Sequence, residues 1–248
     1  MLGTELKSAL VTGGSGGIGS EIVHLLHGDG IAVIAVSSEG EKLDALAGEL
    51  GIETHCMDIT DAELVSSAFG DREIDIVINC AGVLGPLSKL HETPADVAVN
   101  LVGVNLVGML NFVRAVTPGM IARNRGHIIN FGSVAGLYPF SGEPFYAATK
   151  AGVHLFSQNL RMDLYGTDVR VSEILPGRVA SGMHAQMVGG DTARGQRQFY
   201  DGYDCLTPPD IAHAVRYVLS APRHVDITHL EIMPTRQVMG GAQFLKNE

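Results

Sequence analysis

Short apolar runs alternate along the chain with longer segments whose apolar residues recur at helical spacing. The runs are rich in β-branched residues, and the run IAVIAV at 31–36 contains no polar position. Strands that are apolar on both faces are typical of a parallel sheet covered on both sides. The predicted strands are 8–12, 31–36, 52–56, 74–80, 126–132, 168–175 and 229–233.

Helical periodicity fills the intervals between these runs. The predicted helices are 17–29, 39–50, 61–70, 96–123, 144–165 and 208–221. Alternation of strand and helix predicts a doubly wound α/β sheet with helices on both faces. No linker or repeat divides residues 1–248, so we expect a single domain. The segment 178–206 is rich in Gly, Arg and Gln with weak periodicity, and we expect it to form a loop that acts as a substrate lid.

Composition and charge narrow the class of protein. Hydrophobic residues make up 46% of the chain and charged residues 18%, as in a globular protein with a full core. The formal net charge of −10 argues against nucleic acid or an anionic membrane as a partner. The three cysteines and ten histidines lack metal-ligand spacing, so no metal is expected. Without a signal-peptide pattern or an apolar run of about 18 residues, we expect a soluble, cytoplasmic protein.

The stretch VTGGSGGIG at 11–19 follows the first predicted strand and opens the first predicted helix. Gly13, Gly17 and Gly19 have the spacing G-x-x-x-G-x-G. Glycines in this context allow a tight turn and let the backbone approach a pyrophosphate at the helix N-terminus. The strand before and the helix after the motif favour dinucleotide binding over a merely structural turn.

Polar residues at other strand ends are candidates for further cofactor contacts. The second strand ends in Ser37 and Ser38, followed by Glu39, where a dinucleotide enzyme holds the ribose hydroxyls or a 2′-phosphate. Asp58 could accept a hydrogen bond from an adenine amine, although Asp is also a common turn residue. The stretch NCAG at 79–82 ends the fourth strand, where the ligand crevice of such a sheet lies.

A second group of residues points to proton chemistry. Tyr146 and Lys150 are four residues apart in a predicted helix and therefore share one face. Ser133 directly follows the fifth strand, and Asn105 lies in the helix before it. Since all four positions lead to the carboxyl edge of the sheet, we expect them to converge there.

The motifs T-G-x-x-x-G-I-G, N-x-A-G, N-L-x-G, G-S, Y-x-x-x-K and P-G occur in this order from Thr12 to Gly177. In this order and spacing they resemble the short-chain dehydrogenase/reductase family, over nearly the whole chain. The resemblance implies a Rossmann-type sheet ordered 3-2-1-4-5-6-7, a homotetramer and a catalytic tetrad of Asn105, Ser133, Tyr146 and Lys150. It also implies NAD(H) or NADP(H) as cofactor. The residues expected to contact the cofactor are Gly13, Ser15, Gly16, Gly17, Ile18, Gly19, Ser37, Ser38, Asp58, Ile59, Asn79, Ala81, Gly82, Tyr146, Lys150, Pro176, Gly177, Val179 and Ser181.

Each member of the tetrad has an expected role. A phenol titrates near 10, so Tyr146 needs a nearby cation, and we expect Lys150 to lower its pKa. Tyr146 would then exchange a proton with the substrate alcohol or carbonyl. Ser133 would hydrogen-bond the substrate oxygen, where charge develops. Asn105 would hold a water that links Lys150 to solvent.

Three further stretches resemble one branch of the family, the 3-hydroxy acid (serine-type) dehydrogenases with the clavulanic acid and sulfoacetaldehyde reductases. They are TPGMIARNRGHIINFGS, FSQNLRMDLYGTDVRV and the tail from Leu206 to Gln237. This branch generally uses NADP(H), with arginines where this chain has Ser38 and Glu39. The choice between NAD and NADP therefore stays open.

The branch handles small and often anionic substrates, for which arginine is a suitable partner. Arg178 and Met183 are the expected substrate contacts beside Ser133 and Tyr146. Further candidate arginines are Arg194, Arg197 and Arg236. The predicted function is oxidoreduction of a small hydroxy acid, sulfonate or related aldehyde. The alternatives are a 3-oxoacyl or steroid-type carbonyl reductase and a non-catalytic dinucleotide sensor.

Overall fold

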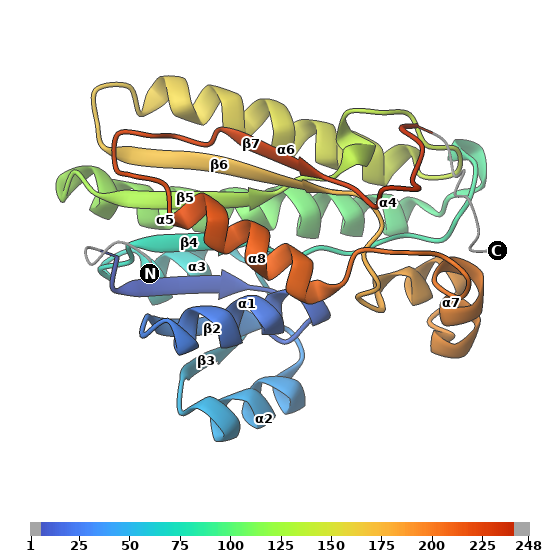
Figure 1. Cartoon of the computed structure of the whole chain (residues 1–248), viewed down its shortest axis with the longest axis horizontal. Coiled ribbons are helices and arrows are strands. Elements are labelled where there is room, and N and C mark those ends of the chain that lie inside the picture. The colour runs from blue at the N-terminus through green and yellow to red at the C-terminus, as the bar shows by residue number, and fades with distance from the viewer. Residues whose placement is uncertain (1–5, 241–248) are drawn as a thin grey trace.

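A computed structural model of the protein describes residues 6–240. Its strands form one parallel sheet in the order β3-β2-β1-β4-β5-β6-β7, which confirms the predicted order (Figure 1). The strands are β1 (Ser8–Thr12), β2 (Ala32–Ser37), β3 (Glu53–Cys56), β4 (Ile76–Asn79), β5 (Gly126–Phe131), β6 (Val169–Pro176) and β7 (His229–Ile232).

Helices cover both faces of the sheet, as the alternation predicts. The α-helices are α1 (Gly17–Gly28), α2 (Gly40–Leu50), α3 (Ala62–Phe69), α4 (Ala95–Val102), α5 (Met109–Ala122), α6 (Pro144–Asp163), α7 (Thr192–Phe199) and α8 (Pro208–Leu219). Shorter helical segments are η1 (Leu90–Glu92), η2 (Gly103–Gly108), η3 (Val134–Gly136) and η4 (Met183–Val188). Helices α1, α2 and α8 pack on one face, and α3, α5 and α6 on the other.

Successive strand residues contribute to different cores because side chains alternate across a sheet. In β4, Ile76 and Ile78 pack with α1 and α8, whereas Val77 packs with α3 and α5. All residues of β4 and β5 are buried. Burial on both faces explains why these strands read as continuous apolar runs.

Local signals set the helix ends. The Asp61 carboxylate accepts hydrogen bonds from two backbone N–H groups in the first turn of α3. Thr207 and Asp210 form a capping box at the start of α8. Helix α2 ends at Gly51, whose φ of 67° suits glycine.

The predicted helix 96–123 is observed as one continuous stretch, α4–η2–α5, with a π-helical turn at Gly103–Gly108. By length and apolar composition alone, Ala95–Ala122 also meets the criteria for a membrane span, as core helices of other proteins do. Residues such as Phe112 and Met120 are fully buried against the sheet. Packing in the core therefore accounts for much of this apolar character.

The segment 178–206, expected to be an irregular loop, contains η4 and α7 instead. The Asp191 carboxylate accepts from the Arg194 N–H and caps α7, a signal that offsets its weak apolar periodicity. Both ends of the segment meet at a parallel bridge between Val179 and Leu206. Helix α7 lies beyond the carboxyl ends of the strands (Figure 1).

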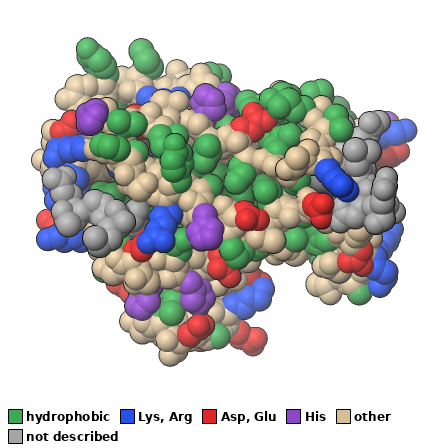
Figure 2. Space-filling view, in the orientation of Figure 1, with side chains coloured by type: hydrophobic (Ala, Val, Ile, Leu, Met, Phe, Trp, Pro, Cys, Tyr) green, Lys and Arg blue, Asp and Glu red, His purple; other side chains and the backbone are tan. Residues whose placement is uncertain are grey.

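Acidic and basic side chains are interspersed on the face in Figure 2, with no continuous basic surface in this view. A notch separates the lobe that carries α2 from the lobe that carries α7. The carboxyl edge of the sheet therefore lies beside a hollow in the molecular surface.

Candidate active site

The turn between β1 and α1 is built from glycines because other backbone segments pass against it. Gly13 has φ +68°, and a Cβ there would lie 2.8 Å from the Cα of Ala81. A Cβ on Gly19 would collide with the carbonyl oxygen of Gly13, and one on Gly17 would lie 2.8 Å from the carbonyl oxygen of Ser181. Three stretches predicted to contact the cofactor therefore meet at this turn.

The N-terminus of α1 opens from the same turn. Gly16 is the N-cap residue and supplies no side-chain hydrogen bond. The first backbone N–H groups of a helix have no acceptor within the helix, so here they are available to an anion. A helix N-terminus reached through glycines accommodates a pyrophosphate. The turn therefore fits a dinucleotide.

The end of β2 carries a compact polar cluster. The Ser15 hydroxyl donates to the buried Ser37 hydroxyl at 2.7 Å and to the Glu39 carboxylate at 3.2 Å. The Glu39 carboxylate also pairs with the Lys42 ammonium at 2.6 Å, while Ser38 is exposed. The expected ribose site therefore holds one negative and one positive charge.

Three other predicted cofactor residues have side chains that are engaged elsewhere. The Asn79 amide donates to Asn130 at 2.9 Å in the interior of the sheet, and Ile59 is buried. The exposed Asp58 carboxylate accepts from the backbone and hydroxyl of Thr60, both at 2.8 Å. Asn79 and Ile59 can therefore meet a cofactor only through their backbone.

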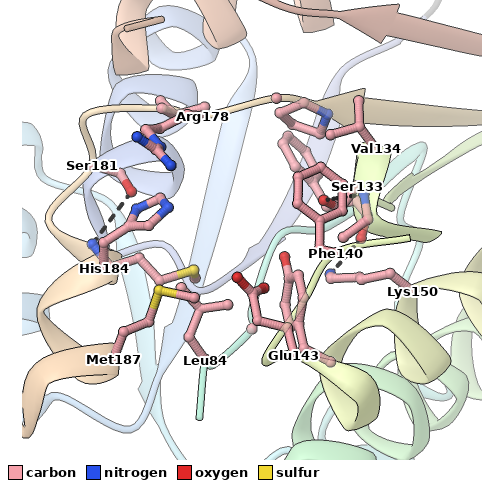
Figure 3. Close-up of a pocket in the computed structure, with 18 of the residues that line it drawn as sticks. Leu84, Ser133, Val134, Phe140, Glu143, Lys150, Arg178, Ser181, His184 and Met187 are labelled. Atoms are coloured by element: carbon pink, nitrogen blue, oxygen red, sulfur yellow. Dashed lines mark hydrogen bonds between the residues drawn. The ribbon is translucent and has the colours of Figure 1, made fainter. Parts of the chain in front are cut away.

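Ser133, Tyr146 and Lys150 line one pocket with residues of the lid (Figure 3). Tyr146 lies in the first turn of α6, and the Ser133 side chain is near enough to its phenol to lower the pKa of that group. The Lys150 ammonium donates to the carbonyl oxygen of Phe131 at 2.7 Å and lies 5.7 Å from the centre of the Tyr146 ring. The structure thus brings three of the four tetrad residues into one pocket.

The pKa of Tyr146 is raised in this structure, whereas a lowered pKa was expected from the charge of Lys150. Burial raises the pKa of Tyr146, the hydrogen bond from Ser133 lowers it in part, and the charge of Glu143 raises it further. Burial also lowers the pKa of Lys150 to about 8. The rise that burial causes outweighs any effect of the ammonium, which lies 5.7 Å from the ring centre and bonds to the Phe131 carbonyl oxygen. Tyr146 therefore holds its proton at neutral pH.

Asn105 lies in the π-helical turn. It was expected to converge on the pocket with the other three residues, but it does not line the pocket. Its side-chain oxygen accepts from the Val83 N–H at 2.7 Å, and its amide donates to the Val83 carbonyl at 2.9 Å. A Cβ on Gly82 would lie 3.3 Å from the Asn105 oxygen and 3.8 Å from the Lys150 nitrogen. Asn105 thus fixes the segment after β4 beside Lys150; a role in holding water stays a prediction.

The other wall of the pocket comes from β6 and the lid. Pro176, Gly177, Val179 and Ser181, all predicted cofactor contacts, line it together with the predicted substrate contacts Arg178 and Met183. The Arg178 guanidinium donates to the carbonyl of Phe199 at 3.3 Å and lies 5.7 Å from the ring centres of Phe199 and Tyr203. Burial lowers the pKa of Arg178, which keeps its charge at neutral pH.

The other candidate arginines lie elsewhere. Arg194 and Arg197 are exposed on α7, Arg236 is exposed after β7, and none of them lines the pocket. The apolar side of α7 faces inward through Phe199, so its arginines point to solvent. The expectation that the lid arginines reach the substrate is not supported by this arrangement.

Sequence reasoning missed two titratable groups in the pocket, Glu143 and His184. Burial raises the pKa of Glu143 to about 7 and lowers the pKa of His184 to about 4. The His184 ring is paired with the Tyr200 hydroxyl at 2.9 Å. Neither residue belongs to a motif; the position of Glu143 three residues before Tyr146 was the available signal.

A third missed group lies behind Lys150. Glu173 is 1% exposed in β6 and pairs with His154 at 2.7 Å, and its charge acts on Lys150. A lone carboxylate in an apolar strand was a signal for such a role. Within residues 6–240, no group of three or more His, Cys, Asp or Glu side chains could hold a metal.

Comparisons with known proteins agree with this geometry. Residues 7–190 match the family described as short chain dehydrogenase. The chain is 39% identical to the NADP-dependent 3-hydroxy acid dehydrogenase YdfG of Salmonella typhi, over 94% of this chain and 96% of that protein. It is 35% identical to the serine 3-dehydrogenase of Rhizobium radiobacter, over 94% and 96%. A solved structure of the closed form of serine dehydrogenase with NADP+ matches with a TM-score of 0.91 and 35% identity, covering 97% of this chain and 100% of that one.

Proposed function

The chain belongs to the short-chain dehydrogenase family, and from this premise we propose that its pocket oxidises a small hydroxy acid or reduces the matching carbonyl compound. The protein is an oxidoreductase that uses a nicotinamide dinucleotide and acts on alcohol groups. The relatives named above act on 3-hydroxy acids and serine. Arg178 in the wall of the pocket supports an acidic substrate here as well.

We assign the chemistry to Tyr146, Ser133 and Lys150. When bound, the nicotinamide accepts or supplies the hydride. In the oxidation direction, Tyr146 takes the hydroxyl proton as the carbon-bound hydrogen leaves; in the reduction direction it returns the proton to the carbonyl oxygen. Ser133 donates a hydrogen bond to the same oxygen, where negative charge develops. For oxidation, Tyr146 must first lose its own proton; the positive charges of Lys150 and of the oxidised nicotinamide, when bound, would offset the burial that raises the pKa of the phenol.

The cofactor is held by the first strand–helix turn and by the strand ends beside it. The glycines of this turn and the N-terminus of α1 would take the pyrophosphate. Ser37, Ser38 and Glu39 would lie at the ribose, and the segment from Pro176 to Ser181 near the nicotinamide. Because Glu39 and Lys42 leave one charge of each sign there, we expect weak discrimination between NAD(H) and NADP(H).

One observation carries the assignment. Ser133, Tyr146 and Lys150 line the same pocket as Ile18 and Gly82, which belong to two of the predicted cofactor-binding stretches. Proton transfer and hydride transfer require this proximity. A non-catalytic sensor would not need these side chains together.

A 3-oxoacyl or steroid-type reductase is the second candidate. The pocket has apolar wall residues, including Leu84, Phe140 and Met187, which favour a larger apolar substrate. The exposed arginines of α7 do not argue against it. The charges of Arg178 and Glu143 in the pocket wall do, because a purely apolar substrate would shield them from water without offering a complementary charge.

We also propose a cytoplasmic location and a homotetramer. Large apolar side chains are exposed on α4 and α6, among them Val99 at 72% and Met162 at 74%. An apolar surface of this kind favours association with another protein surface. The assembly itself is expected from the family resemblance.

A substrate screen tests the proposal. The purified protein is incubated with small hydroxy acids, hydroxy sulfonates, their carbonyl counterparts, a 3-oxoacyl thioester and a steroid ketone, each with NAD(H) and NADP(H). We expect nicotinamide absorbance to change with the small acids. Turnover of the thioester or steroid alone would support the second candidate, and no turnover with any compound would contradict both.

A further inference from the structure

Glu143 places a carboxylate in the wall of the substrate pocket. It lies directly before α6, three residues from Tyr146, and its side chain does not cap the helix. Figure 3 shows the carboxylate pointing into the space between His184 and Met187 on one side and Ser133 on the other. Among the described residues that line the pocket, Glu143 is the only acid.

The charge of Glu143 acts on both of its functional neighbours. It interacts with the Arg178 guanidinium across the pocket, and it raises the pKa of Tyr146. A substrate that brought only a carboxylate would meet Arg178 with attraction and Glu143 with repulsion. A substrate that also brought an ammonium group would neutralise Glu143 and remove a charge that opposes formation of the Tyr146 phenolate.

Resting on the proposed function, we propose that Glu143 is a specificity-determining residue that selects a cationic group beside the reacting carbinol carbon. With Arg178 opposite it, the pocket then favours a zwitterionic 2-amino-3-hydroxy acid over a plain 3-hydroxy acid. In such a substrate the ammonium and carboxylate share the carbon next to the carbinol. Both charges therefore come near the pocket walls when the hydroxyl meets Ser133 and Tyr146.

The pairing has a pH signature. Burial holds the pKa of Glu143 at about 7, so the carboxylate forms as the pH rises through this value. The other titratable or charged groups that line the pocket are Arg178 after β6, His184 from η4, Tyr146 and Lys150 from α6, and Cys80 after β4. Near pH 7, His184 and Cys80 stay neutral, with pKa values of about 4 and about 12, and Arg178 stays charged. The preference for an amino substrate should therefore grow from pH 6 toward pH 7.5, before Lys150 titrates at about 8.

Four probes separate the two charges. Serine carries both, 3-hydroxypropanoate only the carboxylate, serinamide only the ammonium, and 3-hydroxypropanamide neither. Steady-state kcat/KM is measured for each at saturating cofactor, with both serine enantiomers. The proteins are wild type, Glu143→Gln, Glu143→Asp and Glu63→Gln, a control at the exposed first turn of α3.

We expect Glu143→Gln to lower kcat/KM for serine and serinamide by roughly ten- to a hundredfold, the effect of a lost charge-assisted hydrogen bond. The two probes without an ammonium group should lose nothing. Glu143→Asp should keep part of the preference, and Glu63→Gln all of it. The ratio of serine to 3-hydroxypropanoate should rise with pH in the wild type and stay flat in Glu143→Gln.

Equal losses for all four probes in Glu143→Gln, or an unchanged serine to 3-hydroxypropanoate ratio, would overturn the role of Glu143. Turnover of 3-hydroxypropanoate would in that case leave the proposed function standing. No turnover of any probe by the wild-type protein would overturn both. A thermal melt of each variant checks folding, and the near-isosteric glutamine keeps that risk small.

Discussion

The dinucleotide end of the crevice is formed mainly by backbone, whereas the substrate end is lined by side chains. At the turn after β1, the geometry is set by backbone, and Gly13, Gly17 and Gly19 are there because a Cβ has no room. At the substrate end, charged side chains line the pocket, Glu143 from directly before α6 and Arg178 from two residues after β6. The first end has no room for an added methyl group, whereas at the second end a charge can be removed by a near-isosteric substitution.

Removing the phenol oxygen should damage only the chemistry and has the largest expected effect. Tyr146→Phe should lower kcat by about 10²–10⁴-fold, the usual contribution of a general acid–base group. Dinucleotide affinity, measured by titration of cofactor fluorescence, should change little, since the phenyl ring remains. Retention of more than about a tenth of kcat would remove Tyr146 from proton transfer.

A methyl group in the glycine turn should damage only the dinucleotide end. Gly19→Ala places a Cβ against the Gly13 carbonyl, so we expect a loss of about 1–3 kcal/mol in stability, as for an overpacked site. Dinucleotide binding should weaken with it. Gly28→Ala in the same helix is the control, because nothing lies within 4 Å of its Cβ position. Equal unfolding midpoints for the two variants in urea would contradict the backbone contact.

Lys150 is predicted to contact the cofactor and also to take part in catalysis. Its burial should destabilise the folded chain at neutral pH. Its pKa falls from 10.5 to about 8, so the folded state disfavours the charged form that exists below pH 8. The unfolded state binds the extra proton between these values, so the penalty shrinks as the pH rises from 8 to 10.5.

Lys150→Met should therefore abolish activity yet stabilise the protein by about 1–2 kcal/mol at pH 7, after allowance for the lost bond to Phe131. The gain should fade toward pH 10 in urea unfolding. The exposed Lys89→Met is the control. A gain that does not depend on pH would mean that improved packing, and not the charge, is responsible.

The smallest expected effect comes from a substitution at the end of β2, where side chains and not only backbone line the dinucleotide site. Ser38→Arg adds a cation beside Ser37 and should shift the ratio of kcat/KM toward NADP(H) by about tenfold, which corresponds to about 1.4 kcal/mol. Dissociation constants for NAD+ and NADP+ give a second reading. An unchanged ratio would place the 2′ position away from this loop.

The same difference between backbone and side chains explains which features could be predicted from the sequence and which could not. The buried parallel strands and the glycine turn follow from local patterns, namely burial of strands on both faces and absence of a Cβ, whereas the strand order was expected from the family resemblance. Glu143, Arg178 and His184 meet only in the folded chain, so their grouping has no sequence pattern. The expected lowering of the Tyr146 pKa was not found, because the pKa depends first on how deeply the phenol is buried and also on the charge of Glu143, and neither can be read from the sequence.

The bridge between Val179 and Leu206 has a consequence for how this enzyme could be diversified. The Ala180 N–H donates to the carbonyl oxygen of Leu206 at 2.7 Å, and the Leu206 N–H donates to the carbonyl oxygen of Arg178 at 3.0 Å. The two ends of the lid are therefore hydrogen-bonded to each other where the lid joins the rest of the domain. Insertions within such an excursion add little closure entropy, since its ends are already joined. The segment can therefore be exchanged as a unit: replacing residues 182–205 by those of a relative, with Ser181 kept against Gly17, should alter substrate choice while the sheet and the cofactor turn fold as before.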